Sequence, residues 1–207
     1  SWSTAREIVE RFKLRSKLPA SILRAIEEST ELPLPENSSA SHYVLADNRT
    51  ALEAATAHAT SLGFDSVIAE TISEQEIAEG CRELVEGIKV LPEPACLISG
   101  GEFSCPVFGD GIGGRNTETA LRCAIEIAGE SEIVVLSVGT DGVDGNSPAA
   151  GAIADNNTII RAQTVNQNAE VSLRSSDSYN FFANINDAII TGPTGTNVRD
   201  IRILLKS

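Results

Sequence analysis

Short apolar segments alternate with amphipathic helical patterns along most of this chain, and this alternation constrains its fold more than any other feature. Strands that are each followed by a helix are the units from which helix-covered sheets are built. The periodicity predicts helices over residues 4–12, 20–28, 50–62, 74–90, 117–128, 157–165 and 178–183. It predicts strands over residues 43–46, 65–70, 95–99, 102–108, 132–138, 188–191 and 201–205. We therefore expect an α/β fold with mixed or parallel sheets flanked by helices.

Proline and serine content suggests how the chain is divided. A stretch over residues 31–41 is rich in both and predicts a loop. Pro92 and Pro94 follow the helix pattern and mark a boundary. We therefore expect two regions, residues 1–92 and residues 93–207.

Charge and cysteine usage narrow the class of protein. The 207 residues carry a formal net charge of −13, which argues against a nucleic-acid partner because phosphate backbones select basic surfaces. No apolar run approaches the ~20 residues that span a bilayer, and the charged first residues do not read as a signal peptide. Four cysteines without a C-x-x-C pair favour free thiols in a reducing compartment, so we expect a cytoplasmic protein. A disulfide between Cys96 and Cys105 is the alternative.

A loop with the sequence G-D-G-I-G-G-R-N opens directly onto a predicted helix. The N-terminus of a helix carries partial positive charge and unpaired N–H groups, so it attracts anions and disfavours a cation. Arg115 makes most sense there if an anion bridges it to the helix end. We expect Gly113, Gly114, Arg115 and Asn116 to bind a phosphate or carboxylate. The alternative is that the glycines serve tight turning and close packing.

The same loop formally matches the dinucleotide fingerprint G-x-G-x-x-G at Gly109, Gly111 and Gly114. That fingerprint also needs an acidic residue ~20 positions further on, at the end of the next strand. Glu126 has about this spacing but belongs to the predicted helix. The preceding strand is polar and reads as part of a hairpin around Gly100–Gly101, with a sharp bend at these glycines as the alternative. We therefore discount NAD as a ligand.

Two further polar loops follow predicted strands, where ligand sites of α/β folds lie. The first, G-T-D-G-V-D-G, contains Asp141 and Asp144, two carboxylates that can hold Mg²⁺. Turn formation is the alternative, because Asp before Gly is common in turns. The second, G-P-T-G-T-N, offers N–H groups and the hydroxyls of Thr194 and Thr196, which can cradle an anion. The three glycine-rich loops can converge at one end of the sheet.

Four motifs occur in a fixed order between residues 95 and 205: G-G-R-N-T-E, G-T-D-G-V-D-G, D-S-Y-N-F-F and G-P-T-G-T-N-V-R-D. This series resembles the MOFRL domain of class II glycerate 2-kinases, a family whose members are also labelled hydroxypyruvate reductases. Residues 1–92 resemble the end of the larger N-terminal kinase domain of the same enzymes, including the segment A-D-N-R-T-A-L-E-A-A.

The resemblance implies ATP-dependent phosphorylation of the 2-hydroxyl of D-glycerate, with Mg²⁺, in a cleft between two α/β domains. It implies that Arg115 contacts phosphate or the glycerate carboxylate, and that Asp141 holds Mg²⁺ directly or through water. Asp144 is the second candidate for the metal. The remaining candidates for substrate or phosphate binding are Gly101, Glu102, Gly113, Gly114, Asn116, Thr140, Thr194, Thr196 and Asn197.

The chain departs from the family pattern at Thr117, Ser147–Pro148 and Ser176. The front half of the kinase domain, with the catalytic lysine of the family, is not among these residues. We therefore expect the chain alone to lack a complete site and to need the N-terminal half as a partner beside its small-molecule substrates. Assembly into a homo-oligomer stays open. The alternative functions are a non-catalytic nucleotide- or anion-binding module and a hydroxypyruvate reductase.

Overall fold

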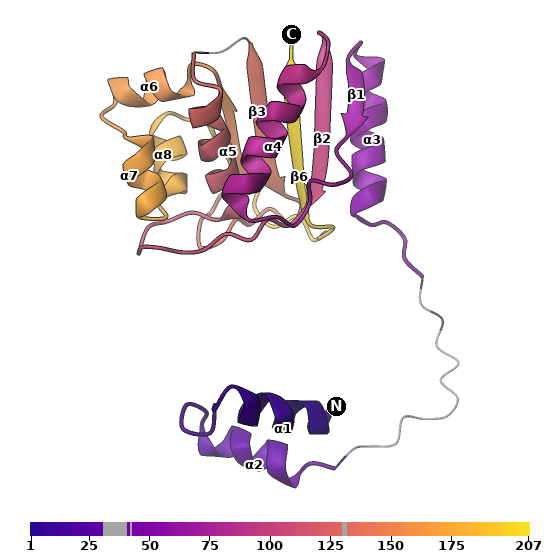
Figure 1. Cartoon of the computed structure of the whole chain (residues 1–207), viewed down its shortest axis with the longest axis vertical. Helices are drawn as coiled ribbons and strands as arrows, with labels where there is room; N and C mark the ends of the chain where they lie inside the picture. Colours follow the sequence, from indigo (N-terminus) through magenta and orange to yellow (C-terminus); the bar gives the residue numbers. More distant parts are fainter. Residues whose placement is uncertain (31–40, 42, 130–131) are drawn as a thin grey trace. The chain divides into compact units, whose positions relative to one another are not determined.

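A computed structural model describes residues 1–30, 41, 43–129 and 132–207 of the chain (Figure 1). Two compact units are present, Ser1–Tyr43 and Val44–Ser207. The loop predicted at 31–41 lies outside the described residues, apart from its last position. None of the described helices is both long enough and apolar enough to cross a membrane.

The first unit is a pair of helices, α1 (Trp2–Arg11) and α2 (Ala20–Glu28), where the apolar periodicity predicts them. The hydroxyl of Ser1 caps α1 by accepting a hydrogen bond from the Thr4 N–H at 3.2 Å. The two helices contact each other, and the Arg6 Nε donates to the last turn of α2 at the Ile26 carbonyl, 3.0 Å away.

The second unit is built on a six-stranded mixed sheet with the order β1-β2-β6-β3-β4-β5. Only β1 and β2 are parallel neighbours, and the other neighbouring pairs are antiparallel. The strands are β1 (Asp65–Ile68), β2 (Ala95–Gly101), β3 (Ile133–Gly139), β4 (Gly151–Asp155), β5 (Ala188–Ile189) and β6 (Asp200–Lys206). The helices are α3 (Asn48–Ser61), α4 (Ile77–Val90), α5 (Arg115–Glu126), α6 (Thr158–Thr164), α7 (Ala169–Arg174) and α8 (Ser178–Asn184). The mixed α/β class predicted from the sequence is confirmed.

The helices cover the sheet unevenly. Figure 1 shows α4 and α5 crossing one face, while α6, α7 and α8 gather beside α5. Helix α4 buries a stripe at helical spacing against the sheet. Strand β2 is buried at every residue because α4 and α3 both pack against it. A separate apolar cluster joins α5 to α8 through Phe181 and Phe182.

Several local predictions were wrong. Residues 43–46 form no strand, and Val44 and Leu45 are exposed. Residues 102–108 also form no strand, so the hairpin predicted at Gly100–Gly101 is wrong and its alternative, a sharp bend, is what forms. Gly101, with φ of 82°, turns the chain away at the end of β2. Strand β4 consists of small residues and was not predicted.

The boundary predicted at residue 92 stays a prediction about the domains of the family. In the structure β1 precedes that boundary and pairs with β2 beyond it, from Asp65 opposite Ala95 to Ile68 opposite Ile98. The division by contacts lies instead between Tyr43 and Val44.

One edge of the sheet collects the segments that were predicted to carry function. Asp200 begins β6 and lies opposite Gly101 at the end of β2 and opposite Gly139 at the end of β3. The helices α3 and α5 also begin at this edge, because Asn48 bonds the Gly101 N–H and Arg115 bonds Asp200. The topology therefore places three strand ends and two helix N-termini side by side.

Candidate active site

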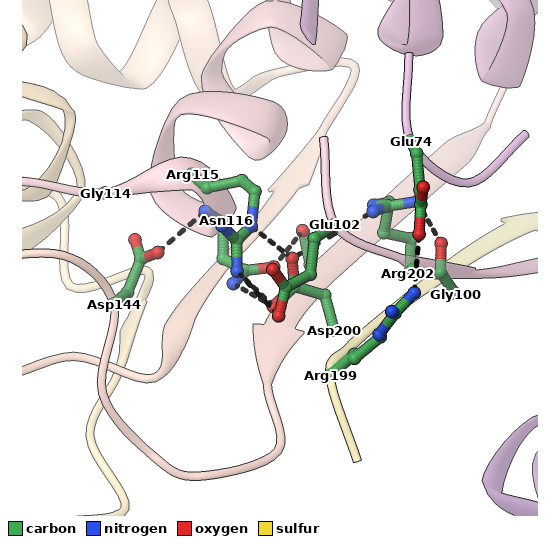
Figure 2. Close-up of polar contacts among 12 residues, drawn as sticks. Glu74, Gly100, Glu102, Gly114, Arg115, Asn116, Asp144, Arg199, Asp200 and Arg202 are labelled. Carbon is green, nitrogen blue, oxygen red and sulfur yellow. Dashed lines mark hydrogen bonds and ion pairs between the residues drawn. The ribbon is translucent and has the colours of Figure 1, made fainter. Parts of the chain in front are cut away.

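Arg115, the first residue of α5, reaches across to Asp200, the first residue of β6 (Figure 2). Its Nε donates to Oδ2 at 2.5 Å and its Nη2 donates to Oδ1 at 3.3 Å. Burial lowers the pKa of Arg115, but the hydrogen bonds and charge of Asp200 outweigh burial and raise it. The side chain of Asp200 is 3% exposed and that of Arg115 is 31% exposed. A two-point contact with a buried carboxylate fixes the plane of the guanidinium.

Asn116 supports this pair from the protein interior. Its Nδ2 donates to Asp200 Oδ1 at 3.0 Å, and its Oδ1 accepts from the Ser137 hydroxyl at 2.8 Å. The residue is 2% exposed. Asn116 therefore lies behind Arg115 and ties α5 to β3 and β6. Its predicted contact with a ligand stays a prediction that this burial does not favour.

Asp144 supplies an anion to the start of α5 from within the chain. Its Oδ1 accepts from the Asn116 N–H at 2.8 Å, and its Oδ2 accepts from the Thr117 N–H at 2.8 Å and the Thr117 hydroxyl at 2.7 Å. Burial raises the pKa of Asp144, and these hydrogen bonds offset the rise only in part. The carboxylate thus caps a helix as sequence logic requires of an anion there.

The prediction of Asp144 as a metal ligand stays a prediction, which the hydrogen bonds of both its oxygens to the start of α5 do not favour. Asp141 is half-buried, accepts from the Val143 N–H at 3.1 Å, and lies 3.4 Å from the Asn197 Nδ2. Within the described part of the chain, no three His, Cys, Asp or Glu side chains cluster as a metal site.

The glycines of the G-D-G-I-G-G-R-N loop serve close packing. A Cβ added at Gly109 or Gly111 would lie 2.6 or 2.5 Å from the carbonyl oxygen of Ser175. A Cβ at Gly114 would lie 2.5 Å from the backbone carbon of Asp144. Gly113 lies against Ser178 in the same way. The dinucleotide fingerprint is thus explained by packing against the neighbouring loops, which supports discounting NAD.

The other two loops are joined to each other by their polar side chains. The Thr140 hydroxyl donates to the Arg199 carbonyl at 2.7 Å, and the Thr194 hydroxyl donates to the Thr140 carbonyl at 2.5 Å. The Thr196 N–H donates to the Thr194 hydroxyl at 3.2 Å. Gly113 N–H in turn bonds the Asn146 side chain at 2.8 Å, so the three loops do converge. The hydroxyls of Thr140 and Thr194 hold the loops together.

Glu102 faces Arg115 from the end of β2, as Figure 2 shows, with 3.6 Å between Glu102 Oε1 and Arg115 Nη2. The Glu102 side chain is 45% exposed, so this ion pair is the solvent-facing one. Gly101 places Glu102 there, since a Cβ on Gly101 would lie 2.5 Å from the Ser73 carbonyl.

Three residues of this edge were not assigned to the site from the sequence: Asn48, Asp200 and Arg202. Asp47 caps α3 by accepting from the Thr50 N–H at 2.9 Å, so Asn48, the first residue of the helix, is free to make other contacts. The Asn48 side chain instead bonds the Asp200 carbonyl at 3.0 Å and the Gly101 N–H at 3.1 Å. Asp200 could have been assigned from the sequence, because it is the last residue of the motif G-P-T-G-T-N-V-R-D.

Arg202 is a fully buried arginine two residues after Asp200 in β6, so the two side chains lie on the same face of the sheet. Its Nη1 donates to the Gly100 carbonyl at 2.6 Å and the Ser99 hydroxyl at 2.8 Å, and its Cζ lies 3.5 Å from the ring centroid of Phe103. Burial lowers the pKa of Arg202 to about 10. A nearby surface pair, Arg199 with Glu74 at 2.6 Å, flanks the same edge.

A cleft of about 390 Å³ opens beside Arg115. Its walls include Val107 and Val143, and Glu118 and Gly114 also line it. Arg115 therefore borders a concave surface, where ligand sites are normally found.

Comparison with known proteins places this geometry in context. The family model described as "MOFRL family" matches residues 95–200, just over half of the chain. A D-glycerate 2-kinase of Thermotoga maritima is 34% identical over 206 residues, covering 96% of this chain and 48% of that protein. A putative hydroxypyruvate reductase of Agrobacterium vitis is 36% identical, covering 97% of this chain and 48% of that protein. The crystal structure of a Thermotoga maritima glycerate kinase superimposes with a TM-score of 0.79 and 32% identity, over 100% of this chain and 50% of that one. The chain spans about half the length of the curated relatives it matches.

Proposed function

The chain belongs to the MOFRL family, and from this membership we propose that it forms the arginine-bearing wall of an ATP-dependent glycerate 2-kinase site. The observation that carries the proposal is Arg115, held by buried Asp200 at the edge where three loops and two helix N-termini meet. The substrate class follows from relatives named D-glycerate 2-kinase and glycerate 2-kinase, at 34% and 30% identity.

The geometry suits phosphoryl transfer, which depends mainly on positioning and charge neutralisation. Asp200 engages the Nε and one Nη2 proton of Arg115. Within the residues that the structure describes, the Nη1 group has no hydrogen-bond partner. A phosphate or carboxylate oxygen takes such donors in a charge-assisted hydrogen bond. Arg115 would therefore bind the anion with its outer edge while its inner edge stays fixed.

Of the two carboxylates in the G-T-D-G-V-D-G loop, Asp141 is the one that fits Mg²⁺ as a ligand. Magnesium is usually held by one or two carboxylates, with water and substrate phosphates completing the shell. Asp141 has a half-exposed carboxylate with weak internal bonds, whereas Asp144 is committed to α5. When bound, Mg²⁺ neutralises phosphate oxygens of ATP, which supplies the phosphoryl group. Asp141 would hold that ion, and Asn197, whose Nδ2 lies 3.4 Å from the Asp141 carboxylate, would support it from the neighbouring loop.

The test is an assay of ADP release from ATP and D-glycerate. It uses this chain alone and a longer form carrying the region that the relatives have and this chain does not span. We expect turnover from the longer form and little or none from the chain alone. Arg115→Ala should lower kcat/KM by roughly 10²- to 10³-fold, as expected for one lost electrostatic donor. Arg161→Ala, which removes a surface arginine paired with Asp187, is the matched control.

Either of two results would overturn the assignment. Full activity of Arg115→Ala would show that the arginine does not act on the transferred group. Binding of ATP with Mg²⁺ by the longer form, without any turnover on glycerate, would indicate a non-catalytic nucleotide-binding module.

A reductase is the second candidate, because two relatives named putative hydroxypyruvate reductase are 36% and 37% identical. The packing of Gly109, Gly111 and Gly114 against neighbouring backbone argues against a dinucleotide site in this loop. Oxidation of NAD(P)H in the presence of hydroxypyruvate, followed by absorbance, tests it directly. We expect no oxidation above the rate of the enzyme-free control.

A further inference from the structure

We propose that Asp200 is a positioning residue of this site, whose buried carboxylate fixes the guanidinium of Arg115 with its Nη1 edge toward the ligand. The inference rests on the proposed function for the identity of that ligand, an anion such as the phosphates of ATP. The orientation of Arg115 is a property of the chain itself and is tested without a ligand.

The sheet leaves space for other side chains beside Asp200. Its neighbours across the sheet are Gly101 on β2 and Gly139 on β3. Side chains directly opposite one another on neighbouring strands ordinarily compete for the same space. Glycine on both sides leaves that space open, and the side chains of Arg115 and Asn116 enter it to reach the carboxylate.

Hydrogen bonds hold both the side chain and the backbone of Asp200. The carboxylate receives two hydrogen bonds from Arg115 and one from Asn116, while Arg202 Nη2 lies 4.0 Å from Oδ2. The backbone carbonyl accepts from Asn48 Nδ2 at 3.0 Å. Because α5 holds the carboxylate and α3 holds the backbone carbonyl, Asp200 can give Arg115 a fixed position.

Four charged side chains follow one another from the core to the solvent. Arg202, Asp200, Arg115 and Glu102 alternate in sign, and their side chains are 0%, 3%, 31% and 45% exposed. The contact of Arg115 with exposed Glu102 is long, at 3.6 Å, and its contact with buried Asp200 is short. An incoming anion can therefore replace Glu102 beside Arg115 while Asp200 keeps its place.

The first experiment follows the Nε–H signal of Arg115 by NMR in the ligand-free chain, with Arg115→Lys identifying the signal. We expect slow exchange of this proton with water in the native chain and exchange at least about tenfold faster in Asp200→Asn, which loses the charged acceptor. Asp187→Asn removes the carboxylate from another arginine, Arg161, and should leave the signal unchanged. An unaltered Arg115 signal in Asp200→Asn overturns the proposal.

The second experiment uses the longer form described above and measures its affinity for ATP with Mg²⁺ by titration calorimetry in a double-mutant cycle. Asp200→Asn should weaken binding by about 10- to 100-fold, the range for lost partners that orient binding groups. It should have no further effect in an Arg115→Ala background, because Asp200 acts through Arg115. Equal losses from Asp200→Asn in both backgrounds would overturn the proposal.

A third variant covers the case in which Asp200→Asn does not fold. Arg115→Lys keeps the charge but cannot make the two-point contact with Asp200. We expect it to lose as much affinity as Arg115→Ala, and native-like affinity overturns the proposal. If the longer form with native residues has no affinity for ATP with Mg²⁺, the proposed function fails, and the NMR comparison still decides the role of Asp200.

Discussion

Replacing Asp144 with alanine tests the claim that this carboxylate is part of the helix rather than of a metal site. The side chain accepts two backbone N–H groups and one hydroxyl at the start of α5. The donors belong to Asn116 and Thr117, which are 2% and 0% exposed, so water cannot easily replace the lost acceptor. We therefore expect the variant to lose stability in the absence of any metal.

The size of the loss follows from the contacts. Leaving a buried donor without a partner costs about 1–3 kcal/mol, and a lost N-cap typically costs about 1 kcal/mol. Part of this is offset, because burial of the Asp144 carboxylate is itself unfavourable, as its raised pKa indicates. We expect a net loss of about 2–4 kcal/mol in the free energy of unfolding.

The assay is urea unfolding followed by far-UV circular dichroism. Tryptophan fluorescence is unsuitable, because the single tryptophan, Trp2, lies in the separate helical unit. The matched control is Asp141→Ala in the same loop, whose half-buried carboxylate accepts one backbone N–H at 3.1 Å and should cost about 0.5–1 kcal/mol. Equal losses from the two variants, or a loss at Asp144 seen only when Mg²⁺ is present, would refute the reasoning.

Two further predictions test the surroundings of the site. Burial, with a smaller contribution from the Glu118 carboxylate, raises the pKa of the Cys105 thiol to about 12. Its alkylation at pH 8 should be roughly a thousand-fold slower than that of a free cysteine and should rise tenfold per pH unit, and mass spectrometry measures the rate. Asn48→Ala removes bonds to the Gly101 N–H and two carbonyls, so it should cost about 1–2 kcal/mol and speed hydrogen exchange at Gly101. A protected Gly101 amide in that variant would contradict the assigned contact.

Most of the described helices were predictable from the sequence because their signals are local. Helix α2 has the bounds that its periodicity predicts, whereas the six-residue helix α7 was not predicted. Strand partners are chosen by distant segments, so they were predicted less well. Gly100–Gly101 has the composition of a hairpin turn, yet β2 is paired with β1 and with β6, a strand about a hundred residues away. Local turn chemistry could not reveal that partner.

The site was also only partly predictable, because its contacts join residues that are distant in sequence. Charge logic at the start of α5 predicted an anion that bridges Arg115 to the helix end, since the helix end and a cation repel each other. Within the chain, Asp144 binds the helix end and Asp200 binds Arg115, at 28 and 85 residues from their partners in sequence, and binding of a ligand anion stays a prediction. Thr140 and Thr194 were predicted to bind substrate or phosphate, and in the structure their hydroxyls donate to carbonyls that join the neighbouring loops to each other. Only the tertiary structure decides whether such a group faces a ligand or a neighbouring loop.

A cation at a helix N-terminus is unfavourable, and here one carboxylate offsets the charge of the helix end while another offsets that of Arg115. The separation of these two carboxylates has a functional consequence. Asp144 satisfies the N–H groups of α5, so Arg115 does not have to share its counter-ion with the helix. Asp200 neutralises Arg115 from the buried side only. If one carboxylate served both, it would lie between the helix end and the guanidinium and block the approach of a ligand. With the two roles divided, the outer edge of Arg115 borders the cleft, where an incoming anion meets a donor already fixed in direction.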